Sequence, residues 1–144
     1  MRTSYLENDL IKLRREFHSQ PELNFDVTET SKKIESILRS ANIEVHNNIG
    51  RTGLVGVIKK GNSNRSIGIR ADMDALPVNE ANTFDYRSKH DGKMHACGHD
   101  GHVTMALGAA RHLAEKEEFD GTAYFVFQPD EEQTQGAQAM IDDG

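Results

Sequence analysis

The sequence has one cysteine, no long apolar run and no excess of positive charge. Because Cys97 has no second cysteine to pair with, an internal disulfide framework is excluded. No stretch of about 18 apolar residues occurs, so we expect no transmembrane helix. The first residues turn acidic at once and lack the apolar core of a signal peptide. These absences predict a cytoplasmic protein without a membrane partner.

The balance of charge argues against a protein that binds nucleic acid. The chain has 17 basic and 23 acidic residues, which gives a net charge of −6. Affinity for nucleic acid depends on clustered lysines and arginines that contact phosphates, and the basic pairs in this chain are isolated. The hydrophobic fraction of 36% and the charged fraction of 28% are ordinary for a globular domain. The 144 residues therefore predict one folded domain.

Hydrophobic periodicity predicts helices and strands in the order ααβββ–loop–αβα. The predicted helices cover residues 6–20, 28–41, 99–117 and 137–143, with Thr28 expected as the N-cap of the second. The predicted strands cover residues 43–45, 54–58, 66–71 and 122–127, with a hairpin-like turn at 60–64. Residues 72–95 form a long irregular region, which is uncommon unless the region is functional. The order predicts an α/β fold with a mixed β-sheet flanked by helices.

Three groups of residues with acidic or metal-binding side chains follow strands or precede a helix. Asp72 and Asp74 come after one strand, and Glu131 and Glu132 come after the last strand. Cys97 and His99 stand at the start of the third helix. In open α/β sheets, ligands bind beyond the carboxyl ends of the strands, so we expect the three groups to converge.

Cys97 and His99 are a possible pair of metal ligands. Residues two apart on extended backbone point to the same side, and a thiolate with an imidazole suits zinc or a similar ion. The helix start beside Cys97 would favour its thiolate. A buried free cysteine beside a surface histidine is the alternative interpretation.

The density of histidines in this region adds weight to the metal hypothesis, because imidazole is the commonest metal ligand. Four of the seven histidines lie within thirteen residues: His90, His95, His99 and His102. His102 follows His99 by three positions on a helix, so the two side chains can share a face. The remaining histidines, at positions 18, 46 and 112, are expected at the surface or in ordinary packing.

The paired carboxylates suit metal-assisted hydrolysis. One of Glu131 and Glu132 could hold a metal while its neighbour accepts a proton from water. Asp72 or Asp74 could orient a ligand imidazole. The alternatives are a solvated acidic turn for the glutamates, and helix capping or turn formation for the aspartates.

Three longer motifs resemble one known family. Residues 70–77 (RADMDALP), 94–102 (MHACGHDGH) and 127–132 (FQPDEE) resemble the amidohydrolase branch of the dinuclear metal-dependent aminoacylase/carboxypeptidase superfamily. Members of this branch include N-acyl-L-amino-acid amidohydrolases, hippurate hydrolases and indole-acetyl-amino-acid hydrolases. The motifs occur in the family's order, and the resemblance covers essentially the whole chain.

The resemblance implies a site and a reaction. Two divalent metal ions are implied, zinc or manganese, with cobalt or nickel as further possibilities. Cys97, His99 and Glu132 match metal ligands, Glu131 matches the general base, and Asp74 matches a carboxylate that orients the site. The implied reaction is hydrolysis of the amide bond of an N-acyl amino acid, a small-molecule substrate.

Family members are much longer than this chain. The resemblance therefore implies that residues 1–144 are the N-terminal part of a single catalytic domain, an incomplete half without the dimerisation domain. We expect an unpaired sheet edge and little activity from the chain alone, although full-length members are often homodimers. Two other functions stay open: a non-catalytic remnant that binds metal weakly, and a hydrolase with Cys97 as its nucleophile.

Overall fold

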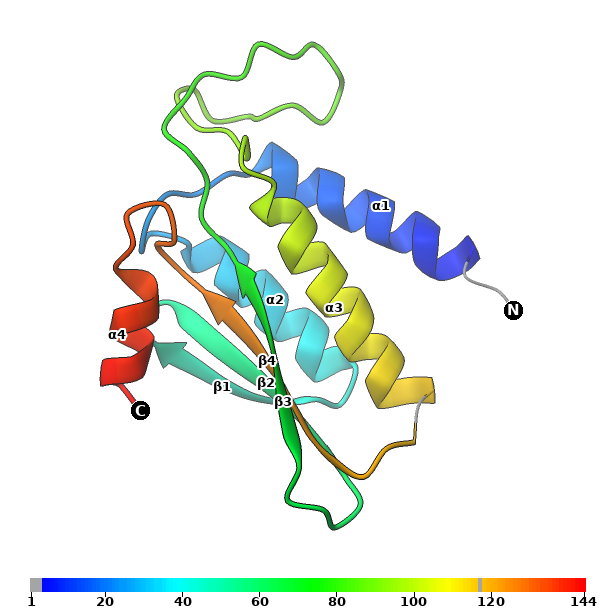
Figure 1. Ribbon diagram of the computed structural model, residues 1–144. Helices are drawn as coiled ribbons and strands as arrows, with labels where there is room; N and C mark the ends of the chain where they lie inside the picture. The colour runs from blue at the N-terminus through cyan, green and yellow to red at the C-terminus, as the bar shows by residue number, and fades with distance from the viewer. Residues whose placement is uncertain (1–3, 117) are drawn as a thin grey trace.

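The computed structural model describes residues 4–116 and 118–144 and confirms a mixed sheet flanked by helices. The helices are α1 (Ser4–Ser19), α2 (Thr28–Ser40), α3 (His99–Lys116) and α4 (Gly136–Asp142). The strands are β1 (Glu44–Ile49), β2 (Gly53–Lys60), β3 (Ser66–Asp72) and β4 (Gly121–Gln128). They lie in the order β1-β2-β4-β3, with β3 parallel to β4 and the other neighbours antiparallel. Figure 1 shows α2 and α3 beside the sheet and α1 beside α3.

The core lies between the sheet and the helices α2 and α3. Ala123, Phe125 and Phe127 of β4 are buried, whereas Tyr124 between them is exposed. This period of two is typical of a strand with one face on the core. The helices contribute apolar residues at helical spacing, among them Ile34, Leu38, Val103, Leu107 and Ala110. The helical period predicted for the first segment holds over α1, although the side chain of Leu6 lies outside the described residues.

The connection between β2 and β3 is not the predicted hairpin, because β4 lies between these two strands. Phe127 of β4 pairs with Leu54 of β2 on one side and with Ala71 of β3 on the other. The Oδ1 atom of Asp120, just before β4, accepts hydrogen bonds of 2.8 Å from the backbone amides of residues 62 and 63. The turn is thus fixed to the start of the strand that separates β2 from β3. The apolar β4 gains two partner strands by taking this central place.

The start of α2 also differs from the prediction. Thr28 is the first helical residue, and Val27 at the cap position makes no side-chain capping bond. The carboxylate of Glu22 takes that role instead, since it accepts hydrogen bonds from the backbone amides of Glu29 and Thr30 at 3.2 and 2.7 Å. A negative charge at a helix N-terminus also interacts favourably with the helix dipole. A residue outside the helix therefore satisfies amides that the sequence pattern assigned to Thr28.

The segment between β3 and α3 is irregular, as predicted, apart from a bridge between Leu76 and Met94. Figure 1 shows its central part, residues 77–93, as an excursion beyond the ends of α1 and α3. The outer side of β3 has no partner strand among the described residues, in line with the expected open edge, and Ile67 on it is 62% exposed. None of the described helices is long and apolar enough to cross a membrane.

We expect Leu107→Ala to lower the free energy of unfolding by about 2–5 kcal/mol, because Leu107 is fully buried and its truncation leaves a cavity. Met105→Ala, on the same helix but at a side chain that is 65% exposed, is the control and should change stability by less than about 1 kcal/mol. Urea denaturation followed by circular dichroism measures both. Equal losses in the two variants would show that this face of α3 does not form the core.

Candidate metal centre

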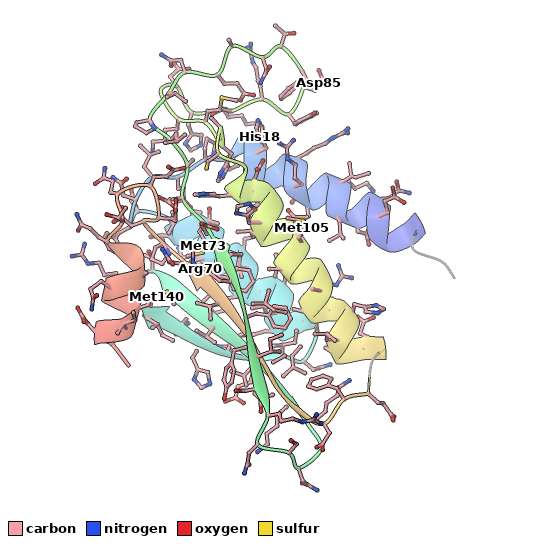
Figure 2. The ribbon with its side chains drawn as sticks, viewed as in Figure 1. His18, Arg70, Met73, Asp85, Met105 and Met140 are labelled. Carbon is pink, nitrogen blue, oxygen red and sulfur yellow. The ribbon has the colours of Figure 1, made fainter. Side chains whose placement is uncertain are left out.

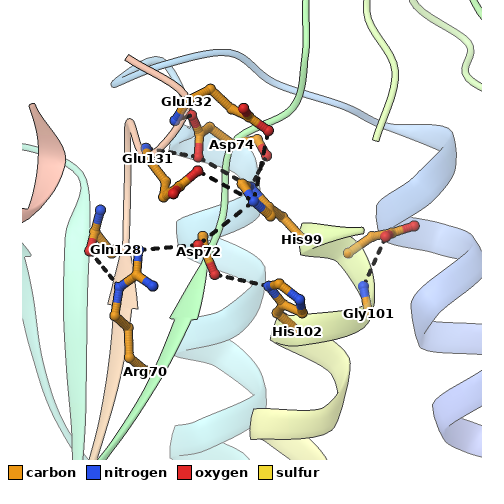
Figure 3. Close-up of polar contacts among 10 residues, drawn as sticks. Arg70, Asp72, Asp74, His99, Gly101, His102, Gln128, Glu131 and Glu132 are labelled. Carbon is orange, nitrogen blue, oxygen red and sulfur yellow. Dashed lines mark hydrogen bonds and ion pairs between the residues drawn. The ribbon is translucent and has the colours of Figure 1, made fainter. Parts of the chain in front are cut away.

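The three predicted groups of residues lie together at one end of the sheet. Because β3 and β4 are parallel, their carboxyl ends meet at the same edge, where Asp72 pairs with Gln128. The chain continues from β3 to Asp74 and from β4 to Glu131, and the first turn of α3 brings His99 to the same place. Figure 3 shows these side chains pointing toward one another. The expected convergence is confirmed.

Asp74 joins the three segments. Its side chain is fully buried, and its two carboxylate oxygens accept hydrogen bonds of 3.1 Å from the backbone amides of Glu131 and Glu132. Its carbonyl oxygen lies 2.8 Å from Nδ1 of His99. Burial alone would raise the pKa of Asp74, but the hydrogen bonds from His99 and the two amides outweigh it and hold this pKa below its ordinary value. Asp74 is therefore a carboxylate that fixes the turn after β4 and the ring of His99.

The orientation of His99 leaves one ring nitrogen facing the other acidic side chains. A carbonyl oxygen only accepts, so Nδ1 donates to Asp74 and Nε2 points away from it. Nε2 lies 3.6 Å from an oxygen of Asp72, 3.6 Å from one of Glu131 and 3.8 Å from one of Glu132. Burial alone would lower the pKa of His99, but the hydrogen bond to Asp74 and the charge of Asp72 raise it to about 9. The ring thus sits among carboxylates that attract a cation.

Two sets of side chains could each hold a metal ion, and they share His99. The first set is Cys97, His99 and Glu132, the three residues matched to metal ligands by the sequence motifs. Within each set the donor atoms lie within 4.8 Å of one another. The Oε1 atom of Glu132 is buried and has no hydrogen-bond partner among the described residues. A buried carboxylate oxygen without a hydrogen-bond partner fits a site for a cation.

The second set is Asp72, His99 and His102. His102 lies one helical turn from His99, as the sequence spacing indicated, and its Nδ1 is 2.9 Å from Asp72. The guanidinium of Arg70 also contacts Asp72 at 3.1 Å and donates to Gln128. Burial would raise the pKa of Asp72, but His102, His99 and Arg70 outweigh it and lower that pKa. Asp72 is thus paired with Arg70 and His102 in addition to His99, whereas the ion pair of Glu132 is with His99.

The environment of Cys97 differs from the expected one. The side chain is exposed at the start of α3, where a helix terminus would favour the thiolate. Desolvation and the carboxylates of Glu132 and Glu131 instead raise the pKa of the thiol. Carboxylates at close range outweigh the helix terminus because they carry full charges. Without a cation in the site, Cys97 is therefore a poor nucleophile.

Of the four clustered histidines, only His99 and His102 belong to these sets. His90 is exposed and pairs with Gln20. His95 is buried, neither ring nitrogen has a partner among the described residues, and burial lowers its pKa to about 4. The density of histidines therefore overstated the number of possible ligands.

His46 and His112 are exposed, and His18 is buried, so all three lie within the expected places, but the sequence did not indicate the two carboxylate partners of His18. His18 is buried next to His95, with 6.5 Å between the ring centroids, and lies between two carboxylates. Its partners Asp100 and Glu80 are 82 and 62 residues away in the sequence. No local pattern marks such a pair, because each partner is more than sixty residues from His18.

Comparison with known proteins agrees with this geometry. Residues 68–144 match the sequence profile of "Peptidase family M20/M25/M40". The chain is 50% identical over 139 residues to a hippurate hydrolase of Campylobacter jejuni, a match that covers 96% of this chain and 36% of that protein. It is 46% identical over 136 residues to the IAA-amino acid hydrolase ILR1-like 2 of Arabidopsis thaliana, covering 94% of this chain and 31% of that protein. The chain thus spans about a third of the length of these relatives.

Among solved structures, the YXEP protein of Bacillus subtilis superposes with a TM-score of 0.94 at 39% identity, over 99% of this chain and 40% of that one. That protein is described as a dinuclear metal-binding peptidase of the M20 family. The profile match covers more than half of the chain, and the fold agrees with that of this relative. The chain belongs to the peptidase family M20/M25/M40.

Proposed function

We propose that this chain is part of a metal-dependent hydrolase that cleaves the amide bond of N-acyl amino acids. The observation that carries the proposal is the set formed by Cys97, His99 and Glu132, with Nε2 of His99 turned toward the carboxylates by Asp74. The names of the related hippurate and IAA-amino acid hydrolases, each acting on an acylated amino acid, support the substrate class.

Each residue has a separate task in this proposal. Cys97, His99 and Glu132 hold divalent metal, zinc or manganese before cobalt or nickel, and the description of YXEP as dinuclear supports two ions. Such ions lower the pKa of water and polarise a carbonyl group. We assign Glu131 as the general base from the sequence motif, and its exposed fraction of 38% and its distance of 3.6 Å from Nε2 of His99 are compatible with that role. Asp74 orients the imidazole of His99 and the turn that carries both glutamates.

A second part of the proposal concerns how much of the catalytic domain this chain contains. We propose that residues 1–144 are the N-terminal part of one catalytic domain, and that turnover needs residues outside this chain. A cytoplasmic location and a homodimeric whole protein stay predictions. The cysteine-nucleophile alternative loses support from the raised pKa of Cys97, and a metal-binding fragment without turnover differs from the main proposal only in activity.

We expect Co²⁺ to give a thiolate-to-cobalt absorption band when it binds the unsubstituted chain. Cys97→Ser should remove this band and weaken cobalt binding at least about tenfold, since a ligand is lost. Asp74→Asn should weaken binding by about 10–100-fold without removing the band, because the amide cannot accept both backbone hydrogen bonds. Optical titration measures both effects, with Glu115→Gln at an exposed position of α3 as the control. Unchanged cobalt affinity in Cys97→Ser would contradict the ligand assignment.

Metal uptake is expected to release protons. His99 has a pKa of about 9 and the pKa of Cys97 is raised, so both groups carry protons at pH 7.5 that a metal must displace. Affinity should therefore rise with pH by about tenfold per unit for each released proton, until the pH exceeds these pKa values. Calorimetry in two buffers with different ionisation enthalpies counts the protons. A binding enthalpy that is independent of the buffer would contradict this prediction.

The catalytic assignment is tested in a whole protein. We suggest replacing the matching third of the Campylobacter jejuni hippurate hydrolase with residues 1–144 and measuring hydrolysis of a panel of N-acyl amino acids. Glu131→Gln should lower kcat by about 10²–10⁴-fold with little change in cobalt affinity, because it removes a general base and no ligand. Glu118→Gln, on an exposed carboxylate, is the control. A fully active Glu131→Gln chimera would refute the role of Glu131.

A further inference from the structure

A second buried polar cluster lies beside the candidate metal centre. Nδ1 of His18 is 2.7 Å from Oδ2 of Asp100, and its Nε2 is 3.0 Å from Oε1 of Glu80. The three side chains are between 1% and 3% exposed. Figure 2 shows His18 at the end of α1, below the excursion that carries Asp85. We call these three residues the carboxylate–histidine bridge.

Each end of the bridge is fixed to a different segment. Asp100 directly follows His99, and its Oδ1 accepts a hydrogen bond of 2.9 Å from the backbone amide of Gly101. The same amide also donates to the carbonyl of Gly98 at 2.9 Å, so Asp100 and Gly98 together hold the first turn of α3. At the other end, Glu80 accepts the backbone amide of Ser88 across residues 77–93. Burial would raise the pKa of Glu80, but the Ser88 amide and His18 outweigh it and lower this pKa to about 2. One continuous set of hydrogen bonds therefore runs from the excursion to the helix that carries His99.

The chemistry of the bridge makes it rigid. Both ring nitrogens of His18 lie within hydrogen-bond distance of a carboxylate oxygen, and a carboxylate oxygen only accepts hydrogen bonds. The bonds are charge-assisted and shielded from water, which makes them short and strong. Without the His18 ring, Glu80 would keep the Ser88 amide and the Asn82 side chain, and Asp100 would keep Arg14 at 3.0 Å, but nothing in the bridge would join the two carboxylates. Breaking one end is therefore expected to disturb the other.

Aromatic contacts hold the excursion over the same histidine. The rings of Phe84 and Tyr86 are stacked with centroids 4.1 Å apart, and both pack against His18 at 5.8 and 5.9 Å. The guanidinium of Arg15 lies 4.6 Å from the centre of the Tyr86 ring. The excursion is thus attached to α1 by packing and by a hydrogen bond of 3.0 Å from the Lys89 amide to the Ser19 carbonyl, and it is joined to α3 through the bridge.

We propose that His18 is a positioning residue that couples residues 77–93 to the start of α3, and through Asp100 sets the place of His99 in the metal centre. The coupling itself follows from the bridge in the metal-free chain. Its effect on metal rests on the proposed function. The excursion and the centre then move as one unit, so a contact made by residues 77–93 changes the geometry of the ligand set.

Hydrogen exchange on the metal-free chain tests the coupling. Glu80→Ala cuts the bridge at the excursion, and Asp85→Ala removes an exposed carboxylate of the same excursion as the control. We expect Glu80→Ala to speed exchange at least tenfold both at Ser88 and at Gly101, with the amides of β4 unchanged. Faster exchange at Ser88 alone would overturn the proposal. If Glu80→Ala does not fold, Glu80→Gln, which keeps an acceptor but not the charge, should show the same pattern at both amides with a smaller amplitude.

Cobalt titration of the same variants tests the effect on the metal centre. The dissociation constant for Co²⁺ should rise at least threefold in Glu80→Ala and stay unchanged in Asp85→Ala, while the absorption band from Cys97 is retained in both. An unchanged constant in Glu80→Ala would overturn the step from the bridge to the metal centre. If the unsubstituted chain shows no Cys97–cobalt band, the proposed function fails, and the exchange measurement still decides whether His18 couples the two segments.

Discussion

The buried carboxylate of Asp74 is the interaction on which the rest of the site depends. An ionised group without water is stable only when hydrogen bonds replace its hydration. Asp74 obtains them from two consecutive backbone amides beyond β4 and lies 3.4 Å from Nδ1 of His99. The turn and the helix start must therefore occupy fixed places relative to the end of β3. One side chain therefore fixes the relative positions of three segments that are distant in the sequence.

The charges around His99 form an unbalanced arrangement. Four carboxylates surround the ring, those of Asp72, Asp74, Glu131 and Glu132. Among the described residues, the ion pairs of Arg70 and His102 are both with Asp72. The hydrogen bond to Asp74 and the charge of Asp72 favour the protonated imidazole, and they outweigh burial and raise the pKa of His99 to about 9. A divalent ion would provide the same compensation with better geometry. The metal-free chain thus substitutes a proton for a metal, and the competition between them is built into the site.

Local and topological rules sufficed to predict much of the fold and the site. Strand and helix periods identified the elements, and the rule on parallel strand ends brought Asp74, His99 and the two glutamates together. Several of the failures involve partners outside the element that the pattern describes. Glu22 completes a helix that begins six residues later, and His18 finds Asp100 across 82 residues. Periodicity carries no information on such pairs, because each side chain alone is compatible with a surface position.

The placement of β4 between β2 and β3 has a consequence for the order in which the chain folds. When β3 leaves the ribosome, β2 is already made, but the strand that separates them in the sheet follows only after the excursion and α3. Both of its ladders close long segments of chain, which is entropically slow. Until β4 arrives, β2 and β3 both expose backbone groups that any strand can pair with. The late insertion of one central strand is therefore the step at which a nascent chain leaves the facing edges of β2 and β3 open to the wrong partner.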